Sequence, residues 1–121
     1  MQRELRRKIT RYLFSLKMKT NSGFAYWSEA IFYCVMKELE GKNKTFKMMD
    51  LYEYLAKKFD TTYSKIEKNM RYAKEQSNYI EVFNLDRSLR NYEFLNYCIY
   101  EVIDSFQDNE EFCRKQEISW V

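Results

Sequence analysis

The sequence contains no proline and only two glycines among its 121 residues. Proteins built from β-strands rely on these residue types for their tight turns, so the composition disfavours a sheet architecture. Residues that helices tolerate well, such as leucine, lysine and glutamate, are abundant instead. We therefore predict an all-α fold, a compact bundle of about six helices. A chain of this length can bury a single core.

Histidine is absent as well, which removes the commonest general base and metal ligand. The sequence has no glycine-rich phosphate loop and no nucleophile turn of the GxSxG type. We expect no enzymatic activity, no cofactor and no metal site. The three cysteines are far apart and form no CxxC pair, which is typical of reduced thiols in a cytoplasmic protein. Cys34 and Cys98 lie in apolar helical stretches and are predicted core residues.

Long hydrophobic runs are also missing, and no stretch approaches the roughly 18 apolar residues of a membrane span. The basic N-terminus lacks the apolar core and the cleavage site of a signal peptide. Its apolar residues recur at helical spacing, at Leu5, Ile9, Tyr12, Leu13 and Leu16. This pattern fits a basic helix docked on its own domain, or a helix lying on a membrane surface.

The charge is unevenly distributed along the chain. Residues 1–20 have a net charge of +6 and residues 101–121 a net charge of −4, within an overall charge of +3. Such asymmetry favours a basic surface for a polyanion and an acidic end turned away from it. Charged helix faces that are merely solvated would explain the same numbers.

Hydrophobic periodicity predicts helices at about 2–19, 24–40, 45–59, 63–77 and 92–106, with a short apolar element, YIEVFNL, at 79–85. Residues suited to ending or capping these helices lie between them: Asn21 or Ser22 after the turn KTNSG, Gly41, Thr45, and Asp60-Thr61-Thr62. The predicted organisation is one domain, 1–106, and a polar, acidic tail, 107–121. The tail ends in Trp120 and Val121, which either fold back on the core or engage a partner.

The segment 51–77 has the outline of a helix-turn-helix. In its second helix Ile66, Met70 and Ala73 fall within about 60° of one another and form a core stripe. Ser64, Lys68, Arg71 and Glu75 project roughly opposite, flanked by Lys65 and Tyr72 on one side and by Glu67 and Lys74 on the other. Such side chains can contact base edges and phosphates in a DNA major groove. An ordinary solvated helix with Lys/Glu pairs would show the same pattern.

The residues LAKKFDTTYSKIEKNMRYA, Leu55 to Ala73, closely resemble the helix-turn-helix of the C-terminal, DNA-binding domain of a response regulator family, stage zero sporulation protein A. YWSEAI, Tyr26 to Ile31, resembles the family's second helix, and NYEFLNYCIYEVI, Asn91 to Ile103, resembles its last. The resemblance covers roughly residues 9–103 and is most specific in the fourth helix.

This resemblance implies a six-helix domain that binds a short DNA box of the TGTCGAA type, often as tandem copies, and regulates transcription in sporulation. It implies a cytoplasmic, bacterial protein that is associated with the nucleoid when bound. Double-stranded DNA is the expected partner, with RNA polymerase and a homodimer or tandem dimer on DNA as further candidates and no membrane. The expected DNA-binding residues are Thr61, Thr62, Ser64, Lys65, Glu67, Lys68, Arg71, Tyr72 and Glu75.

A second hypothesis remains open beside DNA binding. The family has arginine where this chain has Lys65 and Lys68, and lysine cannot make the same two-pronged contact. The family's regulator also carries an N-terminal, phosphorylated receiver domain, which we expect this chain to lack. Both features are compatible with a protein-interaction module or antagonist that keeps the fold and pairs with a full-length regulator or the transcription machinery.

Overall fold

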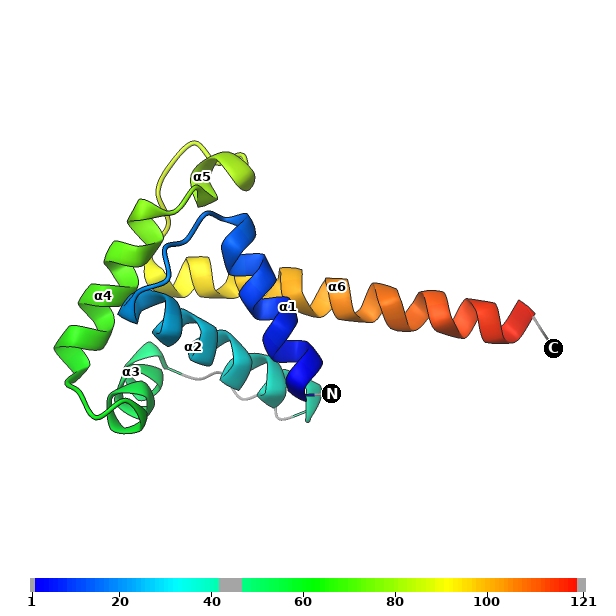
Figure 1. The fold of residues 1–121 in the computed structure, drawn as a ribbon, viewed down its shortest axis with the longest axis horizontal. Coiled ribbons are helices and arrows are strands. Elements are labelled where there is room, and N and C mark those ends of the chain that lie inside the picture. The colour runs from blue at the N-terminus through cyan, green and yellow to red at the C-terminus, as the bar shows by residue number, and fades with distance from the viewer. Residues whose placement is uncertain (1, 42–46, 120–121) are drawn as a thin grey trace.

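The computed structural model describes residues 2–41 and 47–119, with residues 107–119 described by their backbone alone. Within these residues the chain is all-α, as predicted. Figure 1 shows α4 at the left edge with the start of α6 beside it, while the C-terminal part of α6 extends beyond the other helices. The helices are α1 (Gln2–Ser15), α2 (Ser22–Leu39), α3 (Met48–Lys58), α4 (Tyr63–Gln76), α5 (Tyr79–Val82) and α6 (Asn91–Ser119).

Helix α2 is the centre of the single core, because it packs against α1, α3, α4 and α6. Trp27 of α2 is fully buried, and its ring meets the buried ring of Phe94 in α6 edge to face, with 4.8 Å between the ring centres. Cys34 and Cys98 are buried, which confirms their prediction as core residues. The predicted apolar positions of α1 are also buried, except Tyr12, which is half-buried. The apolar face of α1 therefore docks on its own domain.

Side chains in the predicted positions cap two of the helices. The Asn21 side-chain oxygen accepts a hydrogen bond from the Phe24 amide over 3.2 Å at the start of α2. The Thr62 hydroxyl accepts one from the Lys65 amide over 3.2 Å at the start of α4. Gly41 follows α2 with φ of +72°, the left-handed conformation expected after a helix end. The predicted cap Thr45 lies outside the described residues.

Two helix ends differ from the prediction. Helix α1 ends at Ser15 rather than near residue 19, because Lys17 adopts φ of +56° and the Met18 amide bonds back to the Leu13 carbonyl. This reversal buries Leu16 and Met18 in the core. Helix α6 continues to Ser119 rather than ending near residue 106. The sequence 107–119 has no proline or glycine to stop it. Trp120 and Val121, for which folding back and binding a partner are the two alternatives, lie outside the described residues.

Within the described residues, no helix is both long and apolar enough to cross a bilayer. The short apolar element predicted at 79–85 forms α5, a single turn, and then reverses direction at Asn84, where φ is +56°. The loop from Phe83 to Arg90 leads from there to the start of α6, beside α4. The path of this loop determines the surroundings of the site described next.

Candidate nucleic-acid interface

A tight turn joins α3 to α4. The Phe59 amide bonds to the Leu55 carbonyl and the Thr61 amide to the Ala56 carbonyl, both over 2.9 Å, and Asp60 between them has φ of +52°. Of the three residues predicted to cap α4, Thr62 is the one that does so. Thr61 is half-buried and Thr62 is exposed. The chain thus passes from α3 into α4 within four residues, 59–62, and α4 lies at the surface of the molecule.

The inner face of α4 consists of the predicted stripe. Ile66, Met70 and Ala73 are all but fully buried, which confirms the periodicity argument. Two residues of α2 hold this face. The Trp27 indole N–H donates to the Met70 carbonyl over 2.7 Å, and a Cβ built on Gly23 would lie 2.4 Å from the Asn69 carbonyl oxygen. Gly23, which the sequence places in a turn, is instead a close contact between α2 and α4.

The outer face of α4 carries most of the predicted site residues. Those that are exposed are Ser64, Lys65, Lys68, Tyr72 and Glu75. Glu67 and Arg71 are half-buried and pair with each other along the helix, with 3.1 Å between Arg71 Nε and Glu67 Oε1. This hydrogen bond raises the pKa of Arg71 above the usual value of an arginine. The Arg71 guanidinium and the Lys68 ammonium both lie over the Tyr72 ring, at 5.2 and 5.6 Å from its centre.

Lys74 departs from the expected arrangement. The sequence places it beside the outer face, but it is only 3% exposed, and its ammonium donates to the Leu89 carbonyl over 2.5 Å. Burial lowers the pKa of Lys74. The Leu89 amide in turn donates to the Tyr79 hydroxyl over 2.8 Å. Lys74 therefore fastens the loop before α6 to α4 and does not belong to the outer face.

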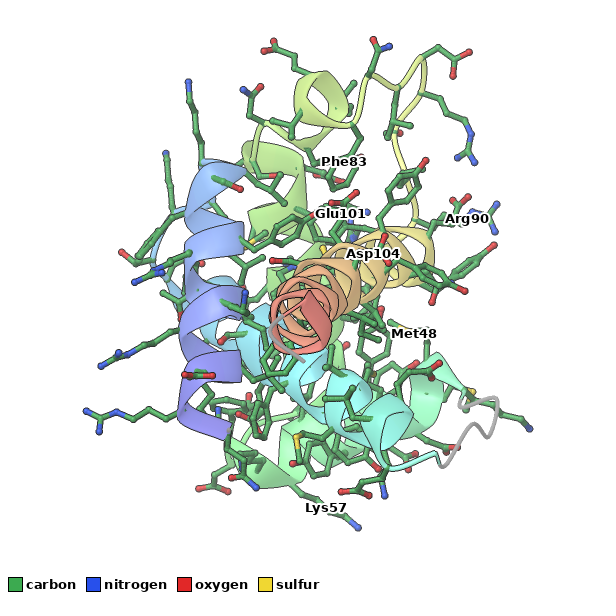
Figure 2. The ribbon with its side chains drawn as sticks, turned by 90° about the vertical axis from the view of Figure 1, so that its right-hand side faces the viewer. Met48, Lys57, Phe83, Arg90, Glu101 and Asp104 are labelled. Atoms are coloured by element: carbon green, nitrogen blue, oxygen red, sulfur yellow. The ribbon has the colours of Figure 1, made fainter. Side chains whose placement is uncertain are left out.

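A cleft of about 300 Å³ lies on the side of α4 that faces α3 and the start of α6. Asn91 lines this cleft and joins α6 to α3 and α4. Its side-chain amide donates to the Tyr52 hydroxyl over 3.0 Å and to the Glu67 backbone carbonyl over 3.5 Å. In Figure 2, Arg90 and Met48 lie on one side of α6, and α1 lies on the other. The lining residues are Met48, Tyr52, Glu67, Arg71, Lys74, Arg90, Asn91 and Tyr92. Sequence analysis missed this cleft, because residues far apart in the sequence form it.

Arg6, one of the cations of α1, is engaged within the domain. Helix α1 packs against α2 and α6. Arg6 pairs with Glu29 over 3.0 Å and stacks on Phe32, with 3.7 Å between the guanidinium carbon and the ring centre. Lys58 of α3 pairs with the same carboxylate over 3.3 Å. Part of the basic charge at the N-terminus thus serves to join α1, α2 and α3.

No cluster of three or more His, Cys, Asp or Glu residues that could hold a metal ion occurs in the described part of the chain. A family model described as sporulation initiation factor Spo0A C terminal matches residues 9–79, more than half of the chain. The match runs from the middle of α1 to the first residue of α5 and includes all of α2, α3 and α4. Searches of curated proteins and of solved structures found no match.

Proposed function

Because this chain belongs to the sporulation initiation factor Spo0A C-terminal family, a family of DNA-binding effector domains, we propose that it binds double-stranded DNA sequence-specifically and regulates transcription. The observation that carries this proposal is the division of α4 into two faces. Its inner face is held rigidly by α2, and its outer face presents cations and hydrogen-bonding groups. A helix of this kind fits the major groove, which is about 12 Å wide.

Each outer side chain has a role that its chemistry supports. Lys68 and Arg71 can donate to guanine edges or to phosphates, Glu67 and Glu75 can accept from cytosine, and Ser64 can contact either. Lys65 can likewise donate to a base edge or a phosphate, and the remaining proposed contacts, to phosphates, are Thr61, Thr62 and Tyr72. The Thr62 hydroxyl already accepts from the Lys65 amide and retains its own hydrogen for a phosphate oxygen. The ring of Tyr72 orders Lys68 and Arg71 before DNA arrives.

On this proposal the protein works in the bacterial cytoplasm, on the nucleoid, in the control of sporulation. Bound next to a promoter, it would act through RNA polymerase. Tandem copies of the binding site would place two copies of the chain side by side as a dimer on DNA. Neither catalysis nor a cofactor is needed, because binding alone gives the regulatory output.

The ion pair between Arg71 and Glu67 favours a second candidate function, protein binding. The Arg71 guanidinium is engaged in this pair, and the neighbouring outer cations are lysines rather than arginines. With its arginine already paired, the outer face of α4 could bind a protein instead of DNA. The chain would then be an antagonist that pairs with a full-length regulator or with the transcription machinery.

Salt dependence of duplex binding separates the two functions. Counterion release makes log K fall linearly with log salt, so a protein that neutralises six phosphates loses about 10³-fold in affinity between 50 and 200 mM salt. We expect a steep loss of this order, measured by fluorescence anisotropy with a labelled duplex. Absence of duplex binding even at the lowest salt would contradict the proposal and favour the interaction module.

A further inference from the structure

Arg90 is the residue immediately before α6, and its backbone is firmly held. Its amide donates to the Glu93 carboxylate over 3.0 Å, and its carbonyl accepts from the Phe94 amide over 3.0 Å. Glu93 also accepts from Arg87, over 2.7 and 3.3 Å. Together these bonds hold the pKa of Glu93 at about 2, with the Arg87 hydrogen bond as the largest cause. Glu93 is therefore ionised at neutral pH, where it can accept the hydrogen bond from the Arg90 amide.

The guanidinium of Arg90 is free for an external ligand. The side chain is exposed, and no hydrogen bond from its guanidinium to another described residue occurs. The nearby carboxylate of Glu93 is already engaged by the Arg87 guanidinium and by the Arg90 amide. Figure 2 shows Arg90 at the outer boundary of the molecule.

The two neighbours of Arg90 in the sequence are both fastened to α4. On one side, the Leu89 carbonyl accepts from the buried Lys74 ammonium over 2.5 Å. On the other side, the Asn91 amide donates to the Glu67 carbonyl of α4 and to the Tyr52 hydroxyl of α3. Arg90 thus has a fixed position relative to α4, although it lies far from that helix in the sequence. A contact made by Arg90 therefore fixes the position of α4 as well.

The cleft between these elements is suited to an anion. Its lining carries three cations, Arg71, Lys74 and Arg90, against one carboxylate, Glu67. Arg71 is paired with Glu67 and Lys74 with the Leu89 carbonyl, so Arg90 is the cation of this lining that offers its donors to an anion. Arg71 stands where the cleft meets the outer face of α4. Arginine is the residue of choice for phosphate oxygens, because its planar fork presents two parallel N–H donors.

We propose that Arg90 is a phosphate contact of the protein–DNA interface. When α4 lies in the major groove, one strand passes the mouth of the cleft, with a backbone phosphate at Arg90, while Arg71 reaches the base edges beside it. This inference rests on the proposed DNA binding and assigns a residue that sequence analysis does not include among the contacts. Phosphate contacts fix the register of a protein on the duplex and carry no base information. Arg90 would therefore set how α4 sits in the groove, while α4 itself contacts the bases.

The test compares Arg90→Ala with Arg87→Ala on a preferred and on a random duplex. Arg87 lies three residues away and carries the same charge, but its guanidinium is held by Glu93. We expect Arg90→Ala to lose about tenfold in affinity for both duplexes, and the slope of log K against log salt to become shallower by about one. Arg87→Ala should lose less affinity than Arg90→Ala, because it leaves the Arg90 guanidinium in place and removes one that Glu93 already engages. Arg90→Lys should recover part of the loss, since it keeps the charge without the fork.

Single neutral methylphosphonates in the duplex locate the contact. One position should weaken wild-type binding and leave binding of Arg90→Ala unaffected, which a merely structural role for Arg90 would not produce. Equal losses for both proteins at every position, or wild-type affinity of Arg90→Ala, would overturn the assignment while DNA binding stands. If the wild type binds no duplex, the proposed function itself fails. Thermal unfolding of each variant shows whether it is folded at the assay temperature.

Discussion

Replacing Gly23 with alanine is expected to destabilise the protein and to displace α4. The new Cβ would lie 2.4 Å from the Asn69 carbonyl oxygen and 2.5 Å from the Ala73 Cβ, and neither atom belongs to a flexible chain end. Helices α2 and α4 must therefore separate, which strains the 2.7 Å hydrogen bond from Trp27 to the Met70 carbonyl. Overpacking of this kind costs about 1–3 kcal/mol. Urea unfolding measures that loss, and affinity for a preferred duplex should fall with it.

Whether Gly23→Ala lowers or raises the free energy of unfolding distinguishes a close contact from an open helix. In an open helix, alanine in place of glycine adds about 0.5–1 kcal/mol of stability. A Gly23→Ala protein more stable than the wild type would show that α2 and α4 do not meet as described. Ser22→Ala is the matched control, because Ser22 is the exposed neighbour of Gly23 in the same helix turn. It should leave both stability and DNA affinity close to those of the wild type.

The second large effect is expected from Arg71→Ala. Loss of an arginine that contacts a base edge should weaken binding to the preferred duplex by about 1–3 kcal/mol and flatten the preference among sequences. The variant also leaves the Glu67 carboxylate without its partner beside the DNA, which adds repulsion. Competition between preferred and random duplexes at one salt concentration measures both effects.

Arg71→Lys serves as the control for charge, because it keeps the cation and loses the fork. It should bind random duplex as the wild type does and discriminate less well. The pair with Glu67 is a solvent-accessible pair within one helix and contributes little to folding, so both variants should remain folded. Equal losses of Arg71→Ala on preferred and random duplexes would make Arg71 a phosphate contact instead of a base contact.

Local patterns in the sequence predicted the order of the helices and the family, but not the ends of α1 and α6. The stripe of Ile66, Met70 and Ala73 follows from helical periodicity, and the Asn21 and Thr62 caps follow from the chemistry of short polar side chains. The family match over residues 9–79 confirms the resemblance noticed in the fourth helix. The resemblance of the last helix lies outside the matched residues and stays a prediction.

The parts that sequence analysis missed depend on contacts between distant residues. Lys74 looks like a surface cation until the loop brings the Leu89 carbonyl to its ammonium. Gly23 looks like a turn residue, because nothing local reveals that α4 passes within contact distance. Arg90 lies in no recognisable motif. The hydrogen bonds of its neighbours Leu89 and Asn91 to residues of α4 are what show that it borders this helix. The cleft could therefore be recognised only from the packed fold.

Selection of bound duplexes from a random pool tests the central claim most directly, because it measures binding and specificity at once. The wild-type chain, incubated with the pool at moderate salt and sequenced over successive rounds, should enrich one short motif. Arg71→Ala, carried through in parallel, should enrich that motif less or lose preference at one of its positions. A wild-type pool that stays as random as the starting material after repeated rounds would contradict sequence-specific DNA binding by the outer face of α4.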